Sequence, residues 1–124
     1  MPASILSQNY LRRRDPRRRV MLGAIVNCRG VTQKVRVVDF SVSGVRLDGI
    51  KGLAAGDPIQ ISLSPELTID GQVVWSVWHK AGVKFVPALS EEHPAFVFLA
   101  EQASAIDRTR TLALASLAKD HARD

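Results

Sequence analysis

Arginine dominates one short part of the chain. Six arginines lie within the eight residues 12–19, with Asp15 and Pro16 between them. Six positive charges against one carboxylate give this segment a net charge of +5, which equals the formal net charge of the whole chain. An arginine side chain presents a planar fork of donors that fits a phosphate or the O6 and N7 acceptors of guanine, and its flat face stacks on a base. The segment therefore suits a ligand that contains both phosphates and guanines.

Arg13 and Arg17 stand four positions apart, directly before the first apolar run. Pro16 fixes its own φ and disfavours helix at Asp15, so we expect both guanidinium groups on an extended or turned arm. Taken alone, an arginine run is equally typical of a solvated tail or of a general nucleic-acid-binding tail. The arginine run alone therefore does not distinguish a specific ligand site from a solvated tail or a general nucleic-acid-binding tail.

A second polar group follows further along the chain. Asp39, Ser41 and Ser43 lie where an alternating strand ends, and Gly44 begins the next strand. A carboxylate there accepts hydrogen bonds from the N1–H and amino groups of guanine, and a hydroxyl bonds a phosphate or a base edge. Gly44 permits a turn or the close approach of a ligand. The competing interpretation is a polar turn in which Asp and Ser bond their own backbone.

Short strands are expected to position these residues. Turns that contain Gly or Pro separate six runs, which we expect to form strands near residues 20–28, 34–37, 45–48, 59–64, 67–78 and 83–85. The first run is apolar at nearly every position, as in a strand covered on both faces. In the fifth run, Asp70-Gly71 predicts a bulge or tight bend. Six strands without an intervening helix indicate an antiparallel β-barrel or sandwich.

The chain changes character after Val86. The residues Ser90-Glu91-Glu92-His93-Pro94 are typical of a helix start, and we expect a helix from about Pro94 with an interruption near Asp107-Arg108. Helical spacing gives this segment an apolar face, made of Phe96, Leu99, Ala103 and Ile106, and further on Leu114 and Leu117 also share a face. That face either packs on the barrel or closes its open end, or it also pairs with a partner or with a second subunit in a homodimer.

Length and composition limit the class of protein. With 124 residues, 46% of them hydrophobic and 23% charged, the chain is expected to be one globular domain. No apolar run approaches the roughly 20 residues that cross a bilayer, and the N-terminus lacks a signal-peptide pattern, so we expect no membrane insertion. Cys28 is the only cysteine, which rules out an internal disulfide and fits a reducing compartment such as the cytoplasm.

The sequence carries few features of an enzyme. His79, His93 and His121 lie far apart without metal-ligand spacing, Cys28 has no identifiable base, and no Gly-rich phosphate loop is present. We therefore expect a receptor that leaves its ligand unchanged, without a metal or a further cofactor. The main alternative is a nucleic-acid-binding module that uses the basic arm. Against it, aromatic residues make up only 6% of the chain, although base stacking needs exposed aromatic side chains.

Taken together, the two polar segments resemble one family. Arg13-x-x-x-Arg17, then one strand, then Asp39-x-Ser41-x-x-Gly44 resemble the ligand motifs of the PilZ domain, a bacterial receptor module for the second messenger cyclic di-GMP. Val73-Val74-Trp75 and Gly82-Val83-Lys84-Phe85 are similar to the later strands of that family. The resemblance covers about residues 11–86 and implies a six-stranded antiparallel β-barrel with a C-terminal α-helix.

The resemblance also implies roles for individual residues. Arg13 and Arg17 would hold phosphate and guanine from the arm, while Asp39, Ser41 and Gly44 would form the half of the site on the barrel surface. In the family, an arginine at the position of Arg12 is associated with a stacked pair of ligand molecules, which implies two cyclic di-GMP molecules per chain.

Further residues are expected at the edge of this site. Additional ligand contacts are expected from Arg14, Ser43 and Trp75, although a tryptophan in an alternating strand is also typical of a core. Long-range attraction of the ligand, without direct contact, is expected from Arg14, Arg18, Arg19 and Arg46.

We divide the chain into a flexible segment at residues 1–11, a ligand-binding domain at residues 12–100 and a helical extension at residues 101–124. The expected mechanism is that ligand binding folds the arm over the barrel and creates a surface that an unidentified downstream protein reads. The family resemblance implies an output in motility, exopolysaccharide or surface-associated behaviour, without choosing among them.

Overall fold

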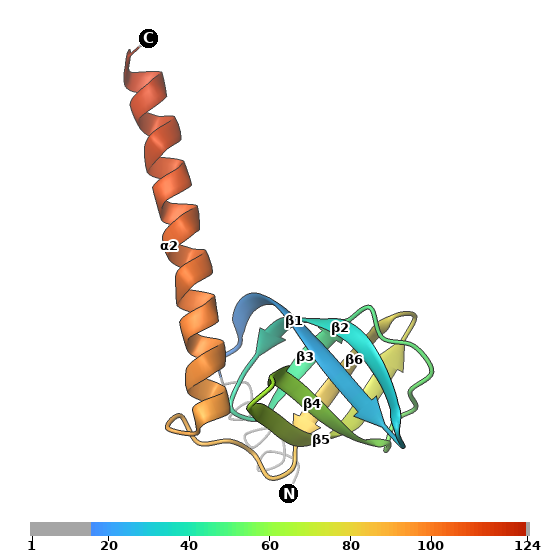
Figure 1. Ribbon diagram of the computed structural model, residues 1–124. Helices are drawn as coiled ribbons and strands as arrows, with labels where there is room; N and C mark the ends of the chain where they lie inside the picture. Colours follow the sequence, from blue (N-terminus) through green and yellow to red (C-terminus); the bar gives the residue numbers. More distant parts are fainter. Residues whose placement is uncertain (1–15, 124) are drawn as a thin grey trace, which may run out of the picture.

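The computed structural model describes the backbone of residues 16–123 and the side chains of residues 16–109. Arg12, Arg13 and Arg14 lie outside the described residues, as do the segment 1–11 and the side chains of Leu114 and Leu117. The elements in Figure 1 are β1 (Arg18–Cys28), β2 (Val31–Phe40), β3 (Gly44–Asp48), β4 (Pro58–Ser64), β5 (Leu67–Val77), β6 (Lys80–Phe85) and α2 (Pro94–Arg123).

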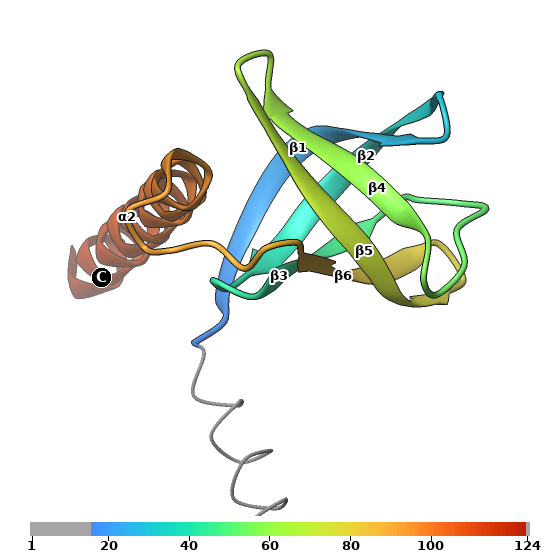
Figure 2. The same cartoon turned by 90° about the horizontal axis from the view of Figure 1, so that it is seen from below.

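The six strands form a closed barrel in the order β1-β2-β3-β6-β5-β4, and every neighbouring pair is antiparallel. Figure 2 shows the strands enclosing one interior, with α2 beside the barrel. The predicted architecture, a six-stranded antiparallel barrel followed by a C-terminal helix, is therefore confirmed. Closure of the sheet gives every strand a hydrogen-bonded neighbour on both sides, with β1 and β4 joined through residues 25–27 and 60–62.

The barrel interior is filled by alternate residues of the strands, because successive side chains of a strand point to opposite faces. Val26, Val37, Leu47 and Ile61 are each at most 1% exposed. These side chains come from β1, β2, β3 and β4, so one apolar core joins strands that are distant in the sequence. This core is the rigid support on which the polar residues of the outer face are held.

The prediction that the first strand is covered on both faces is wrong. Val20 and Ala24 of β1 are buried, but Met21 and Ile25 on the opposite face are 64% and 45% exposed. Solvent covers the outer face of β1 at these two positions. The nearly continuous apolar run therefore corresponds to a strand with one buried face and one face of exposed apolar side chains.

Strand β5 is continuous across Asp70-Gly71, so the prediction of a bulge or tight bend there is wrong. Gly71 pairs in register with Ile59 of β4 and with Phe85 of β6. Glycine is needed inside the strand because a Cβ at this position would press against the Val83 side chain. The register shift between β5 and β6 lies further on, between Val73 and Trp75.

Helix α2 runs from Pro94 to Arg123 without a break. The interruption expected near Asp107-Arg108 is absent, because neither residue type breaks a helix interior as glycine or proline does. The helix also continues through residues 100 and 101, where we divided the binding domain from the extension.

The first turns of α2 pack on the barrel. Leu99 and Ala103 are fully buried, and the Phe96 ring meets the Phe40 ring edge to face, with ring centroids 5.5 Å apart. The predicted packing on the barrel is confirmed for Phe96, Leu99 and Ala103, while pairing with a second subunit or partner stays a prediction. Within the described part of this helix, no stretch combines the length and apolar character needed to span a bilayer.

Candidate functional site

A change of register turns the Asp39 side chain to the outside of the barrel. Val35 and Val37 of β2 are buried in the core, and strict alternation would send residue 39 inward as well. The pairing of β2 with β3 shifts between Val37 and Asp39, as at a β-bulge. The next residue, Phe40, is the one that enters the core. The Asp39 carboxylate is thereby directed to the outer face of the barrel and kept out of the core.

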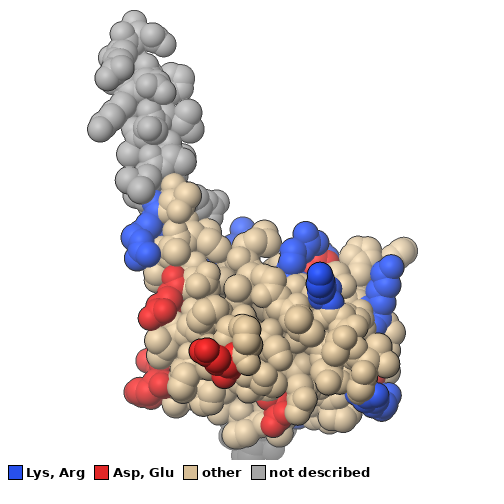
Figure 3. Space-filling model, viewed as in Figure 1, with Lys and Arg blue, Asp and Glu red and all other residues tan. Residues whose placement is uncertain are grey.

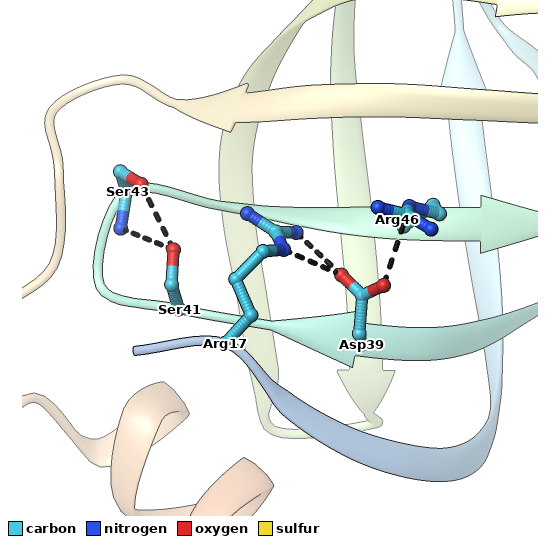
Figure 4. A network of polar contacts seen from close by, with 5 residues as sticks. All are labelled: Arg17, Asp39, Ser41, Ser43 and Arg46. Carbon is cyan, nitrogen blue, oxygen red and sulfur yellow. Dashed lines mark hydrogen bonds and ion pairs between the residues drawn. The ribbon is translucent and has the colours of Figure 1, made fainter. Parts of the chain in front are cut away.

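The Asp39 carboxylate lies between two guanidinium groups (Figure 4). Arg17 donates from Nε and Nη2 to Oδ1 over 2.9 and 2.5 Å, and Nε of Arg46 lies 3.2 Å from Oδ2. The Asp39 side chain is only 14% exposed, so its charge needs these two cations as partners. The fold thus joins Arg17 of the first motif to Asp39 of the second, 22 positions later.

The β2–β3 turn uses its own serine hydroxyls. The Ser41 N–H donates to the Gly44 carbonyl over 2.8 Å, and the Ser43 N–H donates to Ser41 Oγ over 3.2 Å. The two hydroxyl oxygens lie 2.8 Å apart, as Figure 4 shows, and Ser41 is 1% exposed. These bonds match the polar-turn interpretation, so Ser41 shapes the turn that carries Ser43.

Gly44 lets β3 and β6 lie close together. A Cβ at this position would overlap the backbone carbonyl oxygen of Val83, and the nearby Lys84 backbone leaves no room to shift. The Phe85 N–H donates to the Ser43 carbonyl over 2.8 Å, which fixes the turn to β6. The close approach that we expected at Gly44 is therefore, in this structure, an approach between two strands.

A hollow of about 270 Å³ lies beside the Asp39 network. Trp75 forms one wall, and its indole lies over Gly82, where a Cβ would overlap the ring. Trp75 is 38% exposed, so it belongs to the surface and not to the core. The lining residues are Arg17, Ser43, Gly44, Val45, Arg46, Val74, Trp75, Gly82, Val83 and Lys84.

Sequence reasoning did not place Arg46, Gly82 or Lys84 in this hollow. Arg46 was expected to act at long range only, yet it contacts Asp39 directly. In the β3–β6 register, Arg46 is opposite Gly82 and Gly44 is opposite Lys84. Alternation along each strand signals that Arg46 and Lys84 face outward, but only the register shows that they share one hollow.

The remaining arginines of the segment lie away from the hollow or outside the described residues. Arg18 donates from Nη2 to Ser104 Oγ of α2 over 3.1 Å, and its Cζ lies 6.0 Å from the centre of the Phe40 ring. The same Nη2 lies 4.0 Å from an Asp107 carboxylate oxygen. Consecutive residues of an extended chain point in opposite directions, so Arg17 reaches the hollow and Arg18 reaches α2.

Comparison with known families identifies the fold that carries this site. The model of the PilZ domain family matches residues 11–98. The chain belongs to the PilZ domain family. Both motifs of the PilZ domain and the whole barrel fall within the matched residues, which confirms the resemblance inferred from the sequence.

Solved structures support the same fold. The crystal structure of the Borreliella burgdorferi PlzA protein in complex with c-di-GMP is similar to this PilZ domain, with a TM-score of 0.56 and 16% sequence identity. The match covers 79% of this chain and 45% of the PlzA chain, so this chain spans less than half the length of PlzA. At this identity the likeness concerns the fold. A search of curated proteins finds no significant match.

The described residues offer no metal centre. Within residues 16–109, no group of three or more His, Cys, Asp or Glu side chains is placed to hold a metal ion. The polar and aromatic side chains that line the hollow are Arg17, Arg46, Lys84, Ser43 and Trp75.

Proposed function

We propose that this PilZ domain is a receptor for cyclic di-GMP. The observation that carries the proposal is the contact of Arg17 with Asp39 at the edge of the hollow, because it brings both ligand motifs to one place. The family match and the fold shared with PlzA, which was crystallised with c-di-GMP, support it. The proposed site consists of Arg12, Arg13, Arg17, Asp39, Ser41 and Gly44, with additional contacts from Arg14, Ser43 and Trp75.

An exchange of partners at Asp39 accounts for ligand binding. Guanine presents its N1–H and amino group as paired donors that fit one carboxylate, but Arg17 and Arg46 now occupy both oxygens of Asp39. Guanine takes the place of Arg17, and the released guanidinium group binds a phosphate through its planar fork. The partly buried carboxylate keeps a partner throughout the exchange, so no unpaired charge is left behind.

The hollow holds only part of the ligand. Its volume of about 270 Å³ is below the roughly 300–1,000 Å³ of pockets that bury most of a drug-sized molecule, and cyclic di-GMP contains two guanosine units. Arg12 and Arg13 complete the site from the arm, and Arg12 supplies the cation and stacking plane for a second ligand molecule. Trp75 offers its exposed indole to a guanine at the opposite wall.

The energies of arm ordering and ligand contact are similar in size. Ordering about eight arm residues costs roughly 8–16 kcal/mol at ~1–2 kcal/mol each. Several charge-assisted hydrogen bonds at ~1.5–3 kcal/mol each, together with stacking at ~1–3 kcal/mol per base, offset a comparable amount. Arm closure therefore follows ligand concentration. The closed arm creates a surface that a downstream protein reads in the cytoplasm, in control of motility, exopolysaccharide or surface behaviour, and the ligand is left unchanged.

Calorimetric titration with cyclic di-GMP tests the site. Arg13→Ala or Arg17→Ala is expected to weaken binding at least about tenfold, because each removes charge-assisted hydrogen bonds. Asp39→Ala also weakens binding, and Arg12→Ala lowers the number of molecules bound per chain. The matched control is Arg29→Ala, since Arg29 makes a 3.0 Å ion pair with Asp57, a carboxylate that is 13% exposed, outside the hollow.

Two results would contradict this assignment. One is an Arg17→Ala variant that binds cyclic di-GMP as tightly as the unaltered chain does. The other is a chain that does not bind cyclic di-GMP but binds random oligonucleotides with a steep salt dependence, as a general phosphate-binding arm would.

A further inference from the structure

The β5–β6 hairpin ends in an exposed tryptophan with an unusual backbone conformation. Trp78 is 88% exposed and has a φ of 59°, in the left-handed region that favours glycine. A bulky side chain with positive φ is an outlier. Neither core packing nor backbone preference accounts for tryptophan at this position. Backbone strain of this kind concentrates at functional sites, so the exposed indole is a candidate for a functional contact.

The hairpin tip is fixed to the barrel. The His79 carbonyl accepts hydrogen bonds from the N–H groups of Gly49 and Ile50, over 2.8 and 3.1 Å. Ile50 is fully buried, so these bonds tie the tip to the core. Trp78 therefore projects from a rigid base, and an aromatic side chain held in this way loses little conformational entropy on binding.

Apolar side chains and a second hollow adjoin the indole. Val77 is 56% exposed and Trp75 is 38% exposed, both on the strand that leads to the tip. A hollow of about 460 Å³ is lined by Trp75, Val77, Trp78, His79 and Lys80, and we name these five residues the hairpin surface. Contiguous exposed apolar surface marks interaction sites, and tryptophan is enriched among the residues that dominate binding energy.

The charge beside the hairpin surface is positive. Lys80 and Lys84 are exposed on β6, and none of the ion pairs among the described side chains involves either lysine. Asp48 of the neighbouring strand β3, opposite Lys80, is already paired with Arg36 at 3.3 Å, and Asp39 of β2 is paired with two arginines. Asp70, the acid of the other neighbouring strand β5, lines a different hollow. A surface that complements this one is apolar at its centre and acidic around it.

We propose that the hairpin surface docks a partner protein through an apolar segment flanked by acidic residues. A protein fits better than a lipid surface does, because the hollow beside the indole accepts an inserted side chain, whereas a membrane interface only requires aromatic residues that protrude. Trp75 lines this hollow as well as the hollow beside Asp39. Control of docking by cyclic di-GMP rests on the proposed function; docking itself does not.

Photo-crosslinking in cells that naturally produce the chain identifies the partner. A benzophenone amino acid replaces Trp78 in one variant and Val31 in a control variant, because Val31 is 64% exposed on β2, outside the hairpin surface. The expected result is an adduct with a different protein from position 78 alone, attached within a segment that contains apolar and acidic residues. An adduct with lipid, an adduct with a second copy of the chain, or equal labelling from both positions overturns the proposal.

The partner that cross-linking identifies is then purified, and its affinity for variants of this chain tests the contact. Trp78→Ala is expected to lower its affinity at least about tenfold, as truncation of a central aromatic residue does. Lys80→Glu lowers the affinity several-fold through charge reversal, whereas Val31→Ala leaves it unchanged. Because Trp78 and Lys80 are exposed, each variant is expected to keep the urea unfolding transition of the unaltered chain, and this is checked first. Affinity that Trp78→Ala leaves intact overturns the proposal.

Two binding measurements on the same purified chain distinguish failure of the docking proposal from failure of the proposed function. Partner affinity is measured without and with cyclic di-GMP, and cyclic di-GMP binding is measured on the chain alone. If the chain does not bind cyclic di-GMP but Trp78→Ala abolishes docking, only the proposed function fails. If cyclic di-GMP binds normally but docking does not depend on Trp78, only the docking inference fails.

Discussion

Individual residues of this PilZ domain are assigned to different tasks by the face of the strand on which they lie. Arg17 contacts Asp39 beside the hollow, while Arg18, its neighbour, contacts Ser104 of α2. Asp39 itself reaches the outer face only because the β2–β3 register shifts before it. A change of one residue in register would move the carboxylate into the apolar core, where it would lack both arginine partners.

Gly44→Ala is expected to destabilise the domain by about 1–3 kcal/mol, because the added Cβ meets a backbone carbonyl oxygen of Val83 that has no room to move. Urea denaturation measures the change. The matched control is Gly23→Ala in β1, where a Cβ would meet nothing within 4 Å, and its effect is expected to stay within about 0.5 kcal/mol. Equal stability of the two variants would show that the approach of β3 to β6 does not require glycine at position 44.

At the scale of elements, much of the fold could be predicted because alternation and turn residues are local signals. The six strands and the helix start at Pro94 follow from them. The pairing registers do not, since the shift before Asp39 places two apolar residues, Val37 and Val38, side by side in an otherwise alternating strand. The direct contact of Arg46 with Asp39 was missed for the same reason. Which residues share the hollow depends on register, which no local pattern specifies.

Arg18 links the strand that presents Arg17 to helix α2. Arg18→Ala is expected to lower the free energy of unfolding by about 1–2.5 kcal/mol, the sum of a net hydrogen bond to Ser104 at ~0.5–1.5 kcal/mol and a cation–π contact with Phe40 at ~0.5–1 kcal/mol. Urea denaturation gives this value, and amide hydrogen exchange at Leu99 should quicken as α2 loosens.

The neighbouring residue provides the control for that helix contact. Arg19 is exposed, and its side chain makes no hydrogen bond or ion pair with another described residue, so Arg19→Ala is expected to change stability by no more than about 0.5 kcal/mol. If both variants lose the same stability, the effect comes from the general loss of positive charge. A specific link between β1 and α2 would then be refuted.

At the scale of the whole molecule, charge is distributed unevenly. In Figure 3 the acidic side chains gather at the lower left, where α2 begins, whereas Lys and Arg side chains line the upper and right edges of the barrel. The formal net charge of +5 equals that of residues 12–19 alone, so the rest of the chain is balanced. An anionic ligand is therefore drawn to one end of β1, and its binding should weaken as salt screens this attraction.

The number of ligand molecules can be obtained from the stability of the whole domain. A ligand that binds only the folded state stabilises it by about 1.4 kcal/mol for each tenfold rise in ligand above saturation, for every molecule bound. A stacked pair of cyclic di-GMP molecules predicts a slope of about 2.8 kcal/mol per tenfold rise. Arg12→Ala should reduce that slope to about 1.4 kcal/mol, because it removes the cation assigned to the second molecule. The Arg29→Ala control should keep the steeper slope, and a slope of about 1.4 kcal/mol in the unaltered chain would contradict binding as a pair.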